Sequence, residues 1–352
     1  MSAPDYREEP ENVTRSWNPP TTPIQYYLYD DLYSDIFANY KSLTNNTINV
    51  FLTHTGGLTT PNPLNCRLRY SATEDHWKLA LPNPVKEEDV KGGDYYVYGF
   101  IPRDAADGAT ITPNPTYDEG VVLTINGIKT IGADACAIIG AKEGPNADED
   151  NGLQAGDFKF SLNTMGDPPT NYMYLLFDHL ASALSISMKI HSEYYSLRYI
   201  KLKELRMQTA DETGATKAKM DVTVTLNKNT TGSDPIQSVV YTPVGDEEAD
   251  GIVFNSEDGI ALTDEPTLFL SHFIPHGVKE LSLTCVYDVY DKHDKLIRQN
   301  AKATNVIVFK KLIDRLDEVK RGYKYVINLT IKPTYLYVLS EPDLDNPTVT
   351  LE

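Results

Sequence analysis

The sequence predicts an all-β protein made of two tandem antiparallel β-sandwich domains. Segments in which apolar and polar residues alternate recur along most of the chain, and a period of two is typical of a half-buried strand. Turn-forming residues separate these segments at the spacing expected of antiparallel sandwiches. The chain lacks a repeated pattern of strands alternating with helices, which argues against a parallel α/β architecture. Its 352 residues suffice for about two domains.

Residues 1–46 are predicted to be an N-terminal leader followed by a Tyr-rich segment. The leader is rich in Pro and charged residues, a composition typical of a flexible segment. Residues 24–43 are rich in tyrosine, and Asp30 or Asp31 is placed to cap a short helix through Phe37. A strand is the competing interpretation, and the pattern does not separate the two.

Residues 47–193 are predicted to form the N-terminal sandwich. Asn126-Gly127 follows one of its alternating segments and is the residue pair favoured in a type I′ turn, so we expect a hairpin there. The segments expected to be strands are residues 48–52, 66–70, 77–81, 95–101, 120–125 and 157–162.

The central stretch of the chain, residues 171–190, alternates with a period of two in its first and last parts. The alternation breaks across residues 177–183, so a bulge or short turn is expected to redirect the strand at that point. The polar residues Ser185, Ser187 and Lys189 are then expected to face water or a partner sheet.

Residues 194–352 are predicted to form the C-terminal sandwich, with a domain boundary near residues 194–196. Residues 310–320 are expected to be either one short helix or a strand crossover. The expected strands are residues 197–207, 220–226, 238–241, 267–273, 280–290, 304–309 and 323–331.

Residues 334–351 contain two further extended segments. Residues 334–339 alternate, and residues 347–351 are β-branched and extended in character. A terminal edge strand of this kind can pair with the sheet edge of another subunit, with Val349 and Leu351 as the side chains that enter its pockets. The alternative, a tail that closes its own sheet, remains open.

The composition excludes some classes of partner. The chain carries 50 acidic and 32 basic residues, for a formal net charge of −18. Binding of nucleic acid depends on a basic surface, so nucleic acid is not an expected partner. Apolar residues make up 41% of the chain, enough for packed cores, but no apolar run approaches the ~20 residues of a membrane helix. An export signal is not part of the sequence, but this absence is only weak evidence for a cytoplasmic location, and a cell-surface location is expected.

No motif for catalysis or metal binding is present, so we expect a protein without enzymatic activity or cofactor. The nucleophile elbow, the P-loop, the dinucleotide fingerprint and the H-E-x-x-H motif are all missing. The acidic loop 148–152 offers oxygen ligands for calcium but lacks the distal Glu of an EF-hand, so a solvated loop is expected. His272 and His276 flank Pro275 and therefore do not share a helix face. Cys285 is expected to be a small buried hydrophobe.

Four short motifs stand in order within about residues 47 to 333 and resemble the fimbrillin family of Bacteroides-type bacteria. Phe177-x-His179-Leu180 resembles the central strand signature of that family. The others resemble its aromatic strand ending in proline, the short loop before the central strand, and a glycine-to-tyrosine entry into a late strand. They are Tyr96-Val97-Tyr98-Gly99-Phe100-Ile101-Pro102, Asp134-Ala135-Cys136-Ala137 and Arg321-Gly322-Tyr323-Lys324-Tyr325.

The resemblance implies a transthyretin-like topology in each domain, export as a lipoprotein, and a place in an adhesive type V pilus anchored in the outer membrane. In that family, proteolysis after a basic residue removes an N-terminal strand, and the terminal strand of a partner fills the groove. The partners would be other pilus subunits and a host surface ligand.

Carried onto this chain, the resemblance makes Arg15 a candidate for cleavage, or Lys41 if the displaced strand lies later. It makes Val349 and Leu351 the candidate donor positions. His179 is expected to make a structural hydrogen bond rather than to act as a base.

The alternative function is a surface carbohydrate-binding lipoprotein of a polysaccharide-utilisation system. A cluster of tryptophans on one face would favour it, but the chain has only Trp17 and Trp77, and Trp17 lies in the leader. The 23 tyrosines are interpreted as residues of half-exposed strand faces rather than as a sugar-binding platform.

Overall fold

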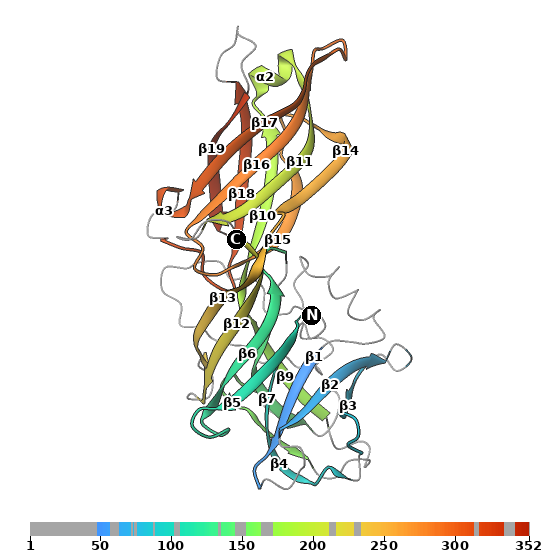
Figure 1. The fold of residues 1–352 in the computed structure, drawn as a ribbon, viewed down its shortest axis with the longest axis vertical. Coiled ribbons are helices and arrows are strands. Elements are labelled where there is room, and N and C mark those ends of the chain that lie inside the picture. The colour runs from blue at the N-terminus through green and yellow to red at the C-terminus, as the bar shows by residue number, and fades with distance from the viewer. Residues whose placement is uncertain are drawn as a thin grey trace.

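The computed structural model confirms an all-β fold (Figure 1). None of the helices in its described residues is long and apolar enough to cross a membrane. Two short helices, α2 (Ser192–Leu197) and α3 (Phe309–Leu312), occur among the described residues. The structure describes residues 48–56, 63–71, 73, 76–86, 89–101, 106–132, 135–144, 153–162, 172–210, 216–228, 234–312, 317–333 and 342–351.

The N-terminal sandwich packs two sheets around one apolar core. The first sheet has the strand order β3-β2-β1-β4-β7-β9, with β8 paired to β4, and the second has the order β13-β12-β6-β5. The strands of the first sheet are β1 (Ile48–His54), β2 (Leu64–Ser71), β3 (His76–Ala80), β4 (Gly93–Ile101), β7 (Cys136–Gly144), β8 (Lys159–Leu162) and β9 (Tyr172–His179). Those of the second are β5 (Gly108–Pro113), β6 (Gly120–Lys129), β12 (Lys217–Asn227) and β13 (Ile236–Glu248).

The C-terminal sandwich has its own apolar core between two four-stranded sheets. Their strand orders are β15-β10-β18-β19 and β14-β11-β16-β17. Figure 1 shows this sandwich stacked on the first along the long axis of the molecule. The strands are β10 (Ala181–Ile190), β11 (Tyr199–Ala210), β14 (Ile252–Leu262), β15 (Thr267–Pro275), β16 (Glu280–Tyr290), β17 (Leu296–Val308), β18 (Lys324–Pro333) and β19 (Pro342–Leu351).

The expected division at residue 193/194 does not separate the two sandwiches. Strand β10 precedes this point but belongs to the C-terminal sandwich. Strands β12 and β13 follow it, yet β12 pairs with β6 and extends the N-terminal sandwich. The polypeptide therefore crosses the junction repeatedly, and each sandwich takes strands from both halves of the sequence. The alternation of apolar and polar residues identifies a strand but not the sheet to which it belongs. Strands that follow one another in the sequence are often neighbours in a sheet, but not always.

The predicted strands between residues 48 and 331 all correspond to strands of the structure, whereas β5, β7 and β14 were not predicted. The predicted hairpin at Asn126-Gly127 is wrong. Strand β6 runs through this pair, and a register shift opposite β12 marks a bulge there. Gly127 has a φ of +71°, which is compatible with a bulge. Its N–H donates to Asp221 Oδ1 of β12 over 3.0 Å.

The sheets are antiparallel with one exception, which corrects the purely antiparallel expectation. Residues 183–190 of β10 run parallel to residues 324–331 of β18. These strands are far apart in sequence, so the chain has ample length for the crossover that a parallel pair requires.

The central stretch bends where the alternation breaks, as predicted. Strand β9 ends at His179, Leu180 forms the bend, and β10 begins at Ala181. Ser185 and Ser187 do not face water, since both are buried, and the Ser187 hydroxyl donates to Asn328 Oδ1 of β18 over 2.5 Å. Strands β9 and β10 therefore form one nearly continuous stretch that contributes buried residues to both apolar cores.

Two smaller predictions are also resolved. Cys285 is buried, as expected, and burial raises the pKa of its thiol to about 12. Of the alternatives for residues 310–320, the structure has a short helix, α3, at their beginning. The acidic loop 148–152, the Tyr-rich segment and residues 334–339 lie outside the described residues.

Candidate functional site

The structure brings together the residues of the central signature and of the late-strand entry at the junction between the sandwiches. Phe177 and Leu180 are buried in the N-terminal core, and His179 is buried at the end of β9. Tyr323 lies beside them, since its carbonyl accepts the N–H of Ala183 over 2.9 Å. The junction is therefore the first candidate site.

A buried ion cluster, the Arg321 cluster, ties three distant segments together at this junction. The two terminal nitrogens of Arg321 pair with Asp178 of β9 and with Asp234, which precedes β13. Only 12% of the Arg321 side chain and 2% of the Asp178 side chain are exposed to solvent. Arg321 also donates to the carbonyl of His179 over 3.4 Å. Charges this deeply buried require such partners.

The entry of β18 into its sheet depends on Gly322. Its φ of +69° lies in the left-handed region, which glycine adopts without steric cost. This turn lets the Gly322 N–H donate to the carbonyl of Ala181 over 2.9 Å. The Ser182 hydroxyl bonds to the carbonyl of Lys320 over 2.8 Å and completes the seam. The left-handed backbone at position 322 therefore explains why the late-strand motif contains a glycine there.

His179 and Cys136 form a second buried contact at the junction. Cys136 Sγ lies 3.3 Å from His179 Nδ1, and the two residues are in register between β7 and β9. The Leu180 N–H donates to the carbonyl of Ala135 over 2.7 Å. The Asp134–Ala137 motif therefore does not simply precede the central strand as a loop, because its Cys136 and Ala137 begin strand β7.

Tyr241 contacts the bend at Leu180, and His276 packs against Tyr241. The Tyr241 hydroxyl donates to the carbonyl of Leu180, and its ring meets that of His276 edge-on at 5.1 Å. His276 Nε2 lies 2.9 Å from the carbonyl of Val239. A carbonyl only accepts, so Nε2 carries the proton and Nδ1 is an acceptor in the neutral ring.

The pKa of His276 predicts a loss of stability in mild acid. Burial lowers this pKa below its ordinary value of 6.5 and outweighs the bond to Val239, which acts in the opposite sense. The unfolded chain therefore binds the proton more readily, and the contribution of His276 is fully present above about pH 6.5 and is lost as the pH falls through the folded pKa. Urea unfolding between about pH 7.5 and pH 5 should show a smaller pH dependence in His276→Gln. Equal slopes in the two proteins would contradict this.

The second candidate site is strand β19, which carries the predicted donor residues. Among the described strands β19 pairs only with β18, antiparallel, and so forms one edge of its sheet. Position 349 stands opposite Ile327 and position 351 opposite Tyr325, both of which are fully buried. Directly opposed residues share a sheet face, so both positions lie on the core face. The predicted cleavage residues Arg15 and Lys41 lie outside the described residues.

Sequence reasoning did not single out Asp178, Asp234, Tyr241 or His276 as site residues. Their hydrogen-bond and ion-pair partners across the junction are 37 to 143 positions away along the chain, as for His276 with Val239 and Asp178 with Arg321. The one available signal was Arg321, which begins the late-strand motif directly before a glycine.

Comparison with known proteins gives structural likenesses only. No protein-family model and no curated protein matches the chain. A fimbrial protein from Bacteroides vulgatus is 15% identical with a TM-score of 0.38, over 90% of this chain and 94% of that one. The fimbrial anchor protein Mfa2 from Porphyromonas gingivalis is 13% identical with a TM-score of 0.30, over 86% and 89%. At such low values, the likenesses do not by themselves identify a function.

Proposed function

We propose that this chain is a structural subunit of a cell-surface fimbria that mediates adhesion and assembles by strand exchange between subunits. The proposal includes export as a lipoprotein and an outer-membrane-anchored location, as in the family that the four motifs resemble. The names of the fimbrial proteins with similar structures agree with it. Its partners are other pilus subunits and a host surface ligand.

The observation that carries the proposal is the position of β19. Among the described strands β19 is paired along one side only, and such a strand can leave its sheet without breaking a second ladder. The same main-chain hydrogen bonds and the same alternating core-face positions are then available to the groove of a neighbouring subunit. Exchange therefore replaces contacts within one chain by similar contacts between two chains.

The acceptor in this proposal is the groove left when proteolysis removes an N-terminal strand. Cleavage after Arg15 or Lys41 would release that strand, and Val349 and Leu351 of the next subunit would enter its place. Adjacent positions 348 and 350 stand opposite Asn328 and Val326, which are partly exposed. They supply a matched control, because they lie on the other face of the same strand.

Removal of residues 347–352 is expected to leave the monomer folded and to abolish polymerisation after treatment with a trypsin-like protease. The double variant Val349→Asp and Leu351→Asp is also expected to abolish polymerisation, because charged side chains do not enter apolar pockets. Circular dichroism checks the fold, and light scattering measures polymer formation.

The control variant, Thr348→Asp with Thr350→Asp, should polymerise like the wild-type chain. Equal polymerisation of the trimmed chain would exclude β19 as the donor. A wild-type chain that is cleaved but stays monomeric would overturn polymerisation by this route and favour a tip or anchor subunit.

A further inference from the structure

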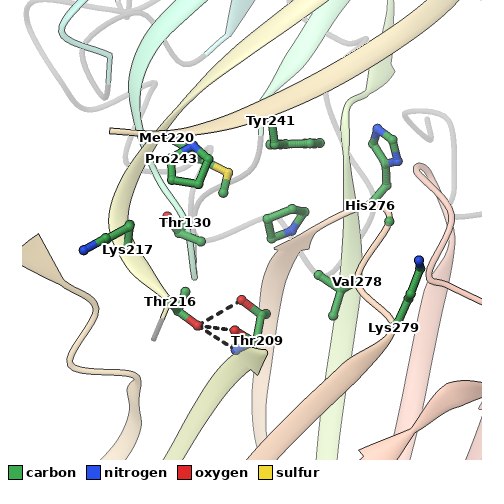
Figure 2. A pocket seen from close by; sticks show the side chains of 12 residues that line it. Thr130, Thr209, Thr216, Lys217, Met220, Tyr241, Pro243, His276, Val278 and Lys279 are labelled. Atoms are coloured by element: carbon green, nitrogen blue, oxygen red, sulfur yellow. Dashed lines mark hydrogen bonds between the residues drawn. The ribbon is translucent and has the colours of Figure 1, made fainter. Parts of the chain in front are cut away.

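A cavity of about 310 Å³ lies at the junction, between β12 and β13 of one sandwich and β11 and the β15–β16 turn of the other. This volume is at the lower end of the roughly 300–1,000 Å³ typical of small-molecule sites, so it suits a ligand of one ring. Figure 2 shows the side chains around it.

One wall of the cavity is apolar and partly aromatic. Met220, Pro243 and Tyr241 lie together on this wall, at the top of Figure 2. The Tyr241 hydroxyl is engaged by the carbonyl of Leu180, so the ring is held in place. A fixed ring beside a proline and a methionine provides a flat surface for the C–H face of a ligand.

The opposite wall carries the hydroxyl groups of Thr209 and Thr216, at the bottom of Figure 2. Thr216 Oγ1 donates its only proton to the carbonyl of Thr209 over 2.5 Å and accepts the Thr209 N–H over 2.9 Å. Thr209 Oγ1, 3.0 Å from Thr216 Oγ1, must then donate to it. The lone pairs of Thr209 Oγ1 therefore remain as acceptors for a ligand hydroxyl.

Thr130 supplies a polar group that the protein itself does not use. Its side chain is buried on the cavity wall, and Oγ1 has no hydrogen-bond partner within the described part of the chain. A buried hydroxyl without a partner is costly. Rotation about χ1 exchanges the methyl and hydroxyl positions of a threonine, so a ligand can satisfy this group.

We propose that this cavity binds a single pyranose unit of a glycan, with the sugar ring against Tyr241 and Pro243 and its hydroxyls on Thr130 and Thr209. A sugar combines an apolar ring face with several hydroxyls, which matches one apolar wall and one hydroxyl wall. None of the described residues that line the cavity belongs to β19, so sugar binding and strand exchange use different residues. The inference rests on the proposed adhesive role and names its ligand class.

Lysine side chains at the rim extend the site toward the outer part of a glycan. Lys279 lines the cavity next to the β15–β16 turn, and Lys217 lines it on β12 with its ammonium on the carbonyl of Asp246 at 3.3 Å. They are cations in a chain with a net charge of −18. A sugar that carries a carboxylate is therefore expected to bind more tightly than a neutral one.

Isothermal titration of the full-length monomer with galactose, N-acetylglucosamine and glucuronic acid tests the proposal. At least one of these sugars is expected to bind, and Thr130→Val should weaken its binding about tenfold, the effect of one lost hydrogen bond. Because the Thr130 hydroxyl has no partner among the described residues, the thermal stability of this variant without sugar should match or exceed that of the wild type. Val278→Phe, which fills the cavity, should abolish binding.

Thr53→Val is the matched control. The Thr53 hydroxyl is also buried and without a partner among the described residues, but it lies on β1, away from the cavity. This variant should bind sugar like the wild type. No binding of any of the three sugars to the wild type, or equal binding by Thr130→Val, would overturn the proposal. Polymerisation after cleavage is measured separately, so failure of assembly and failure of sugar binding are distinguishable.

Discussion

Replacing Arg321 by Met is expected to lower the free energy of unfolding by about 3–5 kcal/mol. Removal of one partner from a buried ion group leaves uncompensated charge, and here Asp178 and Asp234 would both lose the guanidinium. Asp178 is 1% exposed, so water does not replace the lost contact. Because Arg321 also reaches the carbonyl of His179, the loss should loosen the bend between the sandwiches. Urea unfolding of the two proteins at neutral pH measures the effect.

A solvent-exposed pair provides the control for this prediction. Lys310 and Asp317 lie 2.8 Å apart with 74% and 68% of their side chains exposed. Water screens such a pair, so Lys310→Met should lower stability far less than Arg321→Met. Addition of Asp178→Asn to Arg321→Met should recover part of the lost stability, because the amide carries no charge. Similar losses for Arg321→Met and Lys310→Met would show that the buried cluster does not hold the junction.

Replacing Gly99 by Ala is expected to cost about 3 kcal/mol, at the upper end of overpacking effects. Gly99 lies within the aromatic strand motif on β4 and pairs with Val50 of β1. A methyl group there would stand 2.0 Å from the carbonyl oxygen of Asn49 and 2.8 Å from Ile138 Cδ1. The first contact is with backbone inside the sheet, so relief requires β1 to move away from β4.

Gly245→Ala separates the clash from the general cost of losing a glycine. Gly245 has a φ of +74°, and a methyl group there would have no atom within 4 Å beyond its chain neighbours. The substitution therefore carries backbone strain alone, about 1–2 kcal/mol. Chemical denaturation of both variants tests the difference. If Gly99→Ala loses no more stability than Gly245→Ala, then the close approach of β1 to the motif glycine is not what the motif requires.

The sequence by itself determined the class of the fold, because alternation is a local property of a strand with one dry face. Residues 220–226 are one of the expected strands, and their alternate residues Met220, Val222, Val224 and Leu226 are all buried in β12. The break in the alternation at residues 177–183 correctly placed the bend at Leu180. The hairpin predicted from the Asn126-Gly127 pair was wrong because a glycine with positive φ occurs in a bulge as well as in a turn.

The partner of each strand was decided only by the tertiary structure. Strand β12 belongs to the N-terminal sandwich because it pairs with β6, and β10 runs parallel to β18. The alternation of apolar and polar residues indicates neither of these pairings. The candidate sites depend on these pairings. Asp178 meets Arg321 across 143 positions of the chain, and the cavity takes its walls from strands of both sandwiches. A strand pattern records which side chains are dry, whereas pairing is set by long-range register and by the path of the chain between sheets.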